Sequence, residues 1–394
     1  MRYPTLMVLS SCLLAAAAAP ASADPIVDCG VRSLADAIEH AQGVNPLITF
    51  TGTCNGPIVI KKDGITLKGV GAAIIDGGGQ DAVTIAGASR VSLAGIEVRN
   101  GLNGIVAVNG GHLTLTDVNV YDNLGFGISL QTGSSAVLTD VTTAKNGLHG
   151  LDVQTGSAAT LRGSLAATGN RVFGINVNGS SLTMSTATVT ASGNALGIQI
   201  ATGANAFIND SDSVINATDN FVGLTIVSGA HMVSFGGIIN ASRNQVAGVS
   251  VNSKAGLDLD AASTLNSSNN GDGVLLQEDS VMTVFNTPQF SGKPWFSEIN
   301  AQNNTRNGVR VLTGSSLTLV NQARVISMQN AGTGLVADNG IGLTLVNSTI
   351  TGNTTTDIQL TFGTRADIRT TTFTNYTCDP TVLVRGTSGI TCPH

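Results

Sequence analysis

The chain contains 394 residues, of which only 11% are charged, with 25 acidic side chains against 19 lysines and arginines and a net charge of −6. Because Lys and Arg form no run, the sequence predicts no nucleic-acid partner. Beyond the N-terminal segment, no apolar stretch approaches the roughly 18 residues that span a bilayer, so no membrane span is predicted. A hydrophobic content of 42%, alongside 48 glycines, favours a packed core over a disordered chain.

Residues 1–23 have the features of a signal peptide. An apolar stretch over residues 6–19 is followed by Ala21, Ser22 and Ala23, a small-residue cleavage site before Asp24. We therefore expect a mature protein that starts at residue 24 and is secreted or periplasmic. Lipid attachment at Cys12 is an alternative interpretation, although the apolar stretch continues past this cysteine.

Residues 24–56 are expected to form an N-terminal cap with one short helix. The segment from Ser33 to Gln42 has helical periodicity, and Ser33 is a residue type that caps helix N-termini.

Residues 57–377 repeat one unit, which consists of an asparagine, two or three variable residues, a glycine and an apolar-x-apolar strand. Most intervals are 23 to 26 residues, room for three short strands and three turns. Four equivalent positions without glycine extend the series to about fourteen coils. The junction glycines are Gly104, Gly127, Gly150, Gly174, Gly197, Gly223, Gly248, Gly273, Gly308 and Gly334.

Between junctions the chain alternates apolar and polar residues, as it does from Leu113 to Val120. A single coil cannot bury its own apolar side, so stacking must supply both the core and the backbone hydrogen bonds, with rungs about 4.8 Å apart. The sequence therefore predicts one all-β solenoid domain.

A column of asparagines precedes the junctions. Asparagine tolerates left-handed backbone angles, which suits a tight turn, and at one-rung spacing the side-chain amides can also bond along the stack. The predicted column contains Asn100, Asn123, Asn146, Asn170, Asn194, Asn220, Asn244, Asn269, Asn304, Asn330 and Asn353.

This column resembles the asparagine ladder of the right-handed parallel β-helix, pectate lyase-like superfamily, over essentially all of residues 28–392. The resemblance implies a single-stranded right-handed parallel β-helix whose first coil is plugged by the capping helix. One interval, from Gly273 to Gly308, is 35 residues long. Its excess lies in 286–298, where two prolines and a glycine predict a loop.

Residues 378–394 are expected to form a C-terminal cap around a last strand at 381–384. Cleavage of the signal leaves four cysteines: Cys29, Cys54, Cys378 and Cys392. An even number in an exported protein predicts two disulfides. Of the three possible pairings, Cys29 with Cys54 and Cys378 with Cys392 are favoured, because the others would join opposite ends of a long solenoid.

The catalytic motifs of the enzymes in this superfamily are mostly missing, and no catalytic role is transferred from them. Trp295 is followed by Phe296 rather than by the Asp-His of pectate lyases, and Asp379-Pro380 lacks the His-Asp of alginate epimerases. Only the Gly-Leu-His-Gly at 147–150 is similar to the Gly-His-Gly of polygalacturonases.

The strongest constellation is Asp117 and Asp140 on successive rungs, with Arg162 one rung beyond. Two carboxylates this close should raise one pKa or bind a cation such as Ca²⁺, and the guanidinium could hold a substrate carboxylate. Asp117, Asp140 and Arg162 are therefore candidate catalytic residues, with the two aspartates as candidate metal ligands. The alternative is that these side chains only keep an exposed sheet hydrated.

His149 is a further catalytic candidate, and its neighbour Asp152 a candidate substrate-binding acid. His149 occupies a position that is filled elsewhere by Phe126, Phe173 and Leu196, which also fits an ordinary turn side chain. Trp295 and Phe296 in the long loop are candidate substrate-binding residues, because sugar rings stack on exposed aromatic faces. Packing of the loop aromatics against the rod is the other interpretation.

Two functions are consistent with the sequence. The first is a monomeric secreted or periplasmic β-helix protein that engages a polysaccharide, with lyase or hydrolase activity and a Ca²⁺ requirement as further hypotheses. The second is a non-enzymatic structural, adhesive or surface-interaction protein. Outward charged or aromatic residues gathered in one place favour the first, and uniformly Thr, Ser and Asn faces favour the second.

Overall fold

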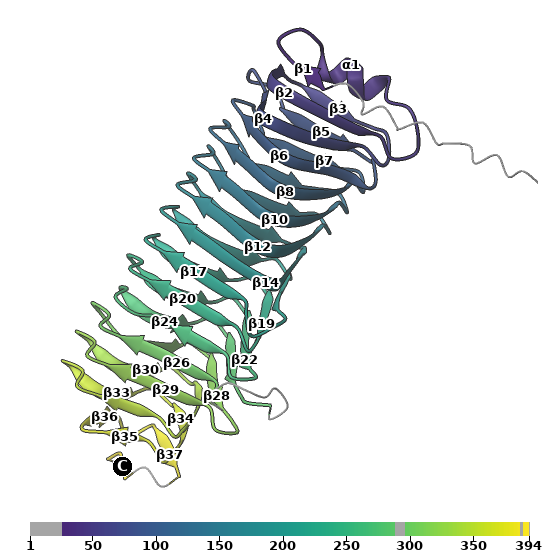
Figure 1. Cartoon of the computed structure of the whole chain (residues 1–394). Helices are drawn as coiled ribbons and strands as arrows, with labels where there is room; N and C mark the ends of the chain where they lie inside the picture. The colour runs from purple at the N-terminus through teal and green to yellow at the C-terminus, as the bar shows by residue number, and fades with distance from the viewer. Residues whose placement is uncertain (1–25, 288–295, 387–388, 394) are drawn as a thin grey trace, which may run out of the picture.

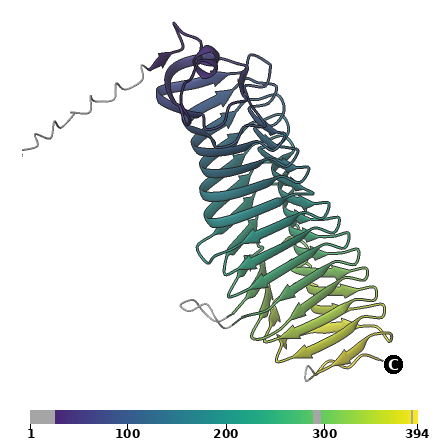
Figure 2. The ribbon, with the colours of Figure 1, turned by 90° about the vertical axis from the view of Figure 1, so that its right-hand side faces the viewer.

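The structure, a computed structural model, describes residues 26–287, 296–386 and 389–393. Successive coils stack into a rod that runs from an N-terminal cap to the C-terminus (Figure 1; Figure 2). Each strand pairs in parallel with its counterparts in the neighbouring coils, for example β11 with β9 and β13. The predicted right-handed parallel β-helix of about fourteen coils is confirmed.

One sheet contains a single strand from each coil and has 14 strands. Its members are β3 (Ile58–Ile60), β5 (Val83–Ala86), β7 (Ile105–Val108), β9 (Ile128–Leu130), β11 (Leu151–Gln154), β13 (Phe173–Asn178), β15 (Leu196–Ala201), β18 (Val222–Ile226), β21 (Ala247–Val251), β24 (Asp272–Leu276), β27 (Val309–Leu312), β30 (Thr333–Asp338), β33 (Thr356–Leu360) and β36 (Tyr376–Cys378).

A second sheet of 23 strands forms the rest of the wall. In its first coils one long strand bends at a residue with positive φ, and in later coils two shorter strands replace it. The members are β1 (Val27–Asp28), β2 (Leu47–Asn55), β4 (Thr66–Asp76), β6 (Val91–Arg99), β8 (His112–Tyr121), β10 (Ser135–Ala144), β12 (Ala158–Thr168), β14 (Ser181–Ser192), β16 (Asn205–Ile208), β17 (Val214–Thr218), β19 (His231–Phe235), β20 (Ile238–Ser242), β22 (Gly256–Asp260), β23 (Thr264–Asn266), β25 (Val281–Val284), β26 (Glu298–Gln302), β28 (Ser316–Leu319), β29 (Arg324–Met328), β31 (Gly342–Val346), β32 (Thr349–Thr351), β34 (Arg365–Arg369), β35 (Thr372–Phe373) and β37 (Leu383–Arg385).

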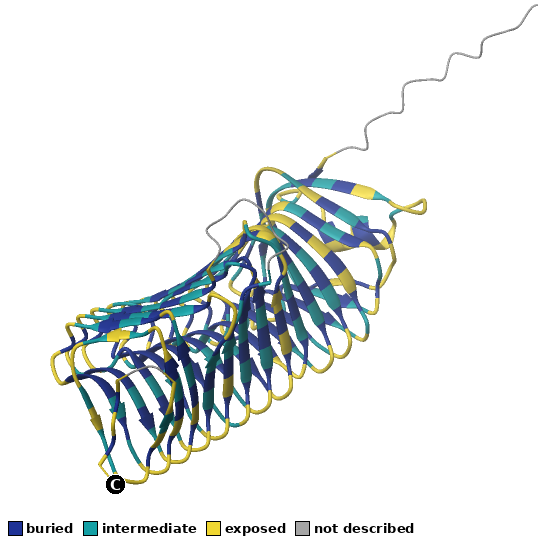
Figure 3. Cartoon of the chain, turned by 90° about the horizontal axis from the view of Figure 1, so that it is seen from below, coloured by how far each residue is buried: buried dark blue, intermediate teal, exposed yellow. Residues whose placement is uncertain are grey.

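The core is a continuous column of aliphatic side chains inside the coils. In β8, Leu115 and Val118 are fully buried while Thr114 and Thr116 are exposed. Figure 3 shows buried residues alternating with more exposed ones along the strands. Each strand contributes every second residue to the shared core. The apolar residues of the alternating sequence therefore face the core, and the polar residues between them face solvent.

A buried asparagine ladder runs along one turn of the stack. Side-chain amides bond one another at 2.9–3.3 Å, and backbone N–H groups also donate to the next side-chain oxygen. At one step the bond is made by the backbone N–H of Asn270, which donates to Asn304 Oδ1 at 2.9 Å. The ladder consists of Asn123, Asn146, Asn170, Asn194, Asn220, Asn244, Asn270, Asn304, Asn330 and Asn353.

The ladder corrects two positions of the predicted column. Asn269 is not the ladder residue, because its neighbour Asn270 is, and Asn100 is one residue too early: Gly101 takes the ladder position and donates its N–H to Asn123 Oδ1 at 2.9 Å. Asn100 and Asn269 instead have φ of 55° and 59°. The residue with positive φ thus precedes the ladder position. The ladder asparagines are therefore not explained by their tolerance of positive φ, contrary to the prediction from the sequence.

The N-terminal cap contains the predicted helix, α1 (Leu34–Glu39), which is shorter than the periodic segment. Ser33 Oγ accepts a hydrogen bond from the Asp36 N–H at 3.2 Å and caps it, while Leu34 and Ile38 are buried in the core. The Cys29–Cys54 disulfide closes this end. None of the described residues forms a helix long and apolar enough to cross a membrane.

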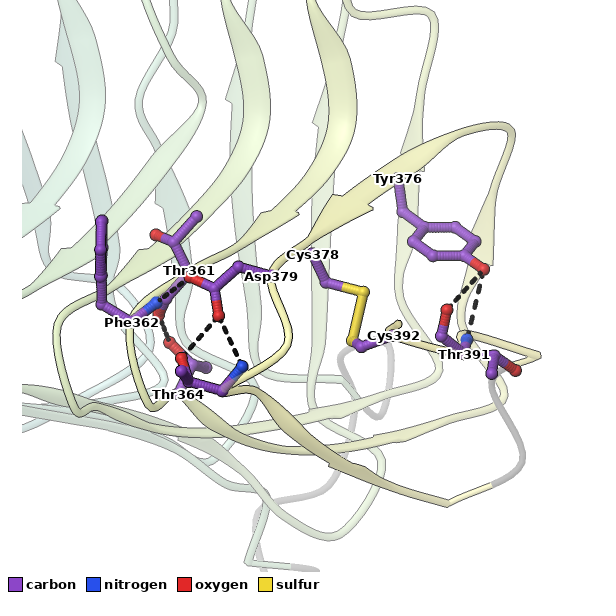
Figure 4. The surroundings of a disulfide bond; sticks show 9 residues. Thr361, Phe362, Thr364, Tyr376, Cys378, Asp379, Thr391 and Cys392 are labelled. Atoms are coloured by element: carbon purple, nitrogen blue, oxygen red, sulfur yellow. Dashed lines mark hydrogen bonds between the residues drawn. A yellow bond between two sulfur atoms is a disulfide. The ribbon is translucent and has the colours of Figure 1, made fainter. Parts of the chain in front are cut away.

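The second disulfide joins Cys378 in β36 to Cys392 near the C-terminus (Figure 4). Beside it the Tyr376 hydroxyl accepts from the Thr391 N–H at 3.2 Å and lies 3.3 Å from the Thr391 carbonyl oxygen. Both predicted pairings are confirmed. The last strand is β37 rather than residues 381–384, and it covers β34.

The additional residues of the long coil lie between β25 and β26, where the loop was predicted. Trp295 falls outside the described residues, and Phe296 is the first described residue after them.

Candidate functional site

Asp117 and Asp140 lie at the bend of the long strands rather than on a flat face. Their φ angles are 55° and 54°, so each carboxylate belongs to the residue that turns the chain between two halves of a strand. The pairing of Thr116 with Thr139 on one side, and of the following valines on the other, places the two aspartates on successive rungs as expected. Both are exposed.

Arg162 is also exposed, and it pairs with Thr139 rather than with Asp140, because the register shifts after Thr139. Asp140 accepts hydrogen bonds from the Ser164 N–H at 2.9 Å and from Ser164 Oγ at 3.0 Å. One oxygen of Asp140 thus accepts both hydrogen bonds from the bend of the next coil. Among the described residues, no three His, Cys, Asp or Glu side chains group into a metal site, so the Ca²⁺ site stays a prediction.

The outer face of the 14-stranded sheet carries a carboxyl group that is almost wholly shielded from solvent. Leu151 and Val153 are in the core, so Asp152 between them points outward, yet it is only 2% exposed. Asp152 Oδ1 accepts from Asn176 Nδ2 at 2.8 Å, and Oδ2 lies 3.4 Å from Ser129 Oγ. Burial raises the pKa of the Asp152 carboxyl, and these two hydrogen bonds lower it only in part.

His149 lies on the same outer face, three residues before Asp152. A Cβ at Gly150 would meet Thr143 Oγ1 and the Asn170 amide inside the coil, so position 150 faces inward and His149 outward. Its ring packs between Phe126 and Phe173, with centroids at 5.2 and 4.5 Å.

The His149 ring is neutral at ordinary pH. Burial lowers its pKa to about 4, and its Nδ1 is buried without a hydrogen-bond partner. The neutral imidazole can accept a proton, and the carboxyl group, with its raised pKa, donates one more readily than an exposed aspartate does.

Further along the same face, two guanidinium groups surround a second buried carboxylate. Asp272 is 1% exposed and lies 3.3 Å from Arg306 Nη2 and 3.2 Å from Arg310 Nη1. Asn307 Nδ2 donates to it at 2.9 Å. Two cations on one anion leave one net positive charge, and both arginines remain partly exposed.

The two clusters lie in line. Stepwise pairing places Asp152 and Arg310 in one outward column, separated by six rungs, or roughly 29 Å at the usual strand spacing. Phe296, by contrast, is beside the 23-stranded sheet, where the Arg324 guanidinium lies 4.7 Å from its ring centroid. His149 lies just before β11 and Asp152 lies within it, on the 14-stranded sheet, whereas Phe296 and the bend of Asp117 and Asp140 lie at the 23-stranded sheet.

The sequence-based prediction missed Asp272, Arg306 and Arg310. The available signal was a pair of arginines, Arg306 shortly before an apolar strand and Arg310 within it, in a chain with few charges. Their partner Asp272 lies 34 residues before Arg306 and 38 before Arg310, because the long loop intervenes.

Several solved structures are similar to this chain, all at low identity. An alginate lyase from Paenibacillus sp. str. FPU-7 is 14% identical with a TM-score of 0.49, over 65% of this chain and 98% of that one. A periplasmic alginate epimerase, AlgG, is 12% identical with a TM-score of 0.47, over 92% and 84%. The A-module of a mannuronan C-5 epimerase, AlgE6, from Azotobacter vinelandii is 15% identical with a TM-score of 0.41, over 89% and 93%. At these identities and scores the similarities carry no argument about what this chain does.

No curated protein sequence matches the chain. Residues 49–213 and 103–321 match the family model described as right handed beta helix region, and together they cover more than half of the chain. The chain therefore belongs to the right-handed β-helix family.

Proposed function

We propose that this protein binds a linear polysaccharide along the outer face of the 14-stranded sheet. The observation that carries the proposal is the alignment of Asp152, half-buried aromatic rings beside His149, and the Arg306–Arg310 pair along one face of the rod. Groups in line over several rungs fit an extended ligand, and a face with rings and charges differs from the uniformly Thr, Ser and Asn faces expected of an inert rod.

Chemistry on the bound chain is proposed at His149 and Asp152. A neutral imidazole can accept a proton, as elimination from a uronate requires, and a carboxyl group with a raised pKa more readily donates a proton to a glycosidic oxygen, as hydrolysis requires. The net charge beside Arg310 favours a polysaccharide with carboxylate groups. The two disulfides fit a secreted or periplasmic protein.

The experiment uses purified residues 24–394 and a panel of polyuronates and neutral polysaccharides. Binding is measured by calorimetry, and turnover by new unsaturated ends for a lyase or new reducing ends alone for a hydrolase. We expect Arg310→Gln to weaken binding of a polyuronate by about tenfold or more. Arg243→Gln, which removes another arginine paired with an aspartate, is the matched control and should leave binding unchanged.

The site of any turnover is decided by two substitutions. We expect Asp152→Asn to abolish turnover with binding retained, and Asp140→Asn to have no effect. The reverse result would assign catalysis to Asp117, Asp140 and Arg162. A Ca²⁺ site at these aspartates would be supported if calorimetry detects heat on addition of Ca²⁺ to the unsubstituted protein but not to Asp140→Asn. Binding without turnover would mean an adhesive or structural role, and no binding to any member of the panel would overturn the proposal.

A further inference from the structure

A cavity of about 250 Å³ lies on a different wall of the rod, where the loop between β25 and β26 rejoins the 23-stranded sheet. Gly236, Ile238 and Ala262 supply small or aliphatic lining on one side. Phe296, Glu298 and Arg324 supply an aromatic ring, a carboxylate and a guanidinium on the other. Gly236 has a φ of 74°, and a Cβ there would lie 3.1 Å from the Ala261 carbonyl oxygen.

The charges in this cavity balance. Arg324 Nε donates to Glu298 Oε2 at 2.7 Å, and the guanidinium also lies over the Phe296 ring. Arg324 and Glu298 side chains are 35% and 17% exposed, and Phe296 is 37% exposed. Unlike Arg310, this arginine has a carboxylate of its own, so the cavity has no net charge with which to select an anion.

An outer row of amides leads away from the cavity. Asn300 Nδ2 donates to Glu298 Oε1 at 2.9 Å and lies 2.9 Å from Asn266 Oδ1. Asn266 and Asn240 continue the row with bonds of 2.8 and 2.9 Å that end on Asn216. These amides are half-buried on the outside of the sheet. Each amide has more donors and acceptors than these bonds use, repeated at rung spacing.

From this arrangement we propose that the cavity binds a neutral sugar ring, whose apolar face packs on Phe296 and whose hydroxyl groups bond Arg324 and Glu298, while the Asn300 and Asn266 amides beyond the cavity are available to an extension of the ligand. An aromatic surface with a few convergent polar groups and no net charge is the chemistry that recognises an uncharged polyhydroxy ring. The site is separate from the outer face of the 14-stranded sheet, and it does not depend on the function proposed for that face.

The test is calorimetric titration of residues 24–394 with neutral gluco-, manno- and galacto-oligosaccharides, and with uronate oligomers for comparison. We expect one of the neutral sugars to bind and Phe296→Leu to weaken that binding by about tenfold. Phe296→Tyr, which keeps an aromatic ring, should retain it.

Phe362→Ala is the matched control, because Phe362 is 67% exposed and lies elsewhere on the rod. Arg310→Gln should also leave neutral-sugar binding unchanged, which separates this site from the one on the 14-stranded sheet. Absence of binding by all neutral sugars, an equal loss with Phe362→Ala, or a loss with Arg310→Gln but not with Phe296→Leu would overturn the proposal.

Discussion

Replacing Asn170 by alanine tests how the inner ladder stabilises the rod. Asn170 is 2% exposed. Its Oδ1 accepts from the N–H and the Nδ2 of Asn146 at 3.1 and 3.0 Å, and its Nδ2 donates to the Thr143 carbonyl at 3.1 Å and to Asn194 Oδ1 at 3.2 Å. The substitution therefore removes four hydrogen bonds at a site that water does not reach.

The expected loss follows from the groups left behind. The buried Asn146 N–H loses its acceptor, which costs about 1–3 kcal/mol, and each remaining lost bond costs about 1 kcal/mol. We therefore expect Asn170→Ala to lower the free energy of unfolding by about 4–6 kcal/mol. Asn240→Ala in the outer row is the control: it also breaks amide bonds, of 2.9 and 2.8 Å, but at a half-buried site where water can replace them. Its cost should be about 1 kcal/mol or less.

The assay is urea unfolding of residues 24–394 followed by circular dichroism, combined with hydrogen exchange. Solenoids unfold in units of neighbouring coils, so exchange of the amides near residues 143–146 reports the local effect better than one global midpoint. Asn170→Ala should speed this exchange strongly, and Asn240→Ala should not. Equal effects of the two substitutions would refute the idea that burial makes the inner ladder important.

Three further predictions concern other residues. Burial lowers the pKa of His149 to about 4, below the unfolded value of about 6.5. The residue therefore contributes stability above pH 6.5 that is lost as the pH falls towards 4. The thermal midpoint of His149→Phe should lack this decline. At Asp357 burial raises the pKa, but hydrogen bonds from Thr374 and Asn353 outweigh it, so the pKa is lowered. Its stabilisation is present above about pH 4 and lost as the pH falls through the folded pKa, and Asp357→Asn should flatten this acid limb of the stability curve. Replacing Cys29 and Cys54 by serine removes a link across 25 residues and should cost about 3 kcal/mol in chemical unfolding, whereas no loss would mean that α1 alone holds this end.

Much of the fold could be predicted because its determinants are local and repeated. Alternation identifies strands, and the near-constant spacing of glycines and asparagines identifies coils. The errors at Asn100 and Asn269 occurred where two adjacent residues both suit the turn. In the pair Asn269–Asn270, spacing cannot tell which asparagine takes positive φ and which points into the coil. At Asn100 the true ladder position is Gly101, which has no side chain to reveal it.

The end of the ladder shows why side-chain partners were harder to predict than strands. Asp357 takes the junction position that glycine occupies in most coils, and its Oδ1 accepts from the Nδ2 of Asn353 at 3.0 Å. A carboxylate thus replaces the amide that another coil would have supplied. Its Oδ2 accepts from the Thr374 N–H at 2.7 Å. The sequence placed Asp357 at a junction, but only stacking shows that it receives the last donor of the ladder.

Stacking also separates the candidate sites. Position in a coil was enough to place Asp117 and Asp140 on neighbouring rungs, but not to show that both occupy the bend and are exposed. Asp152, unlike Asp117 and Asp140, lies in the middle of a strand and faces outward. There, Asn176 and Ser129 on the adjacent rungs shield its carboxyl group from solvent. Burial raises its pKa, and the two side chains that bond it belong to residues 23 and 24 positions away. In a solenoid the chemical environment of a residue is set by its neighbours one coil away, so an error of one position in the register changes a shielded acid into a hydrated one.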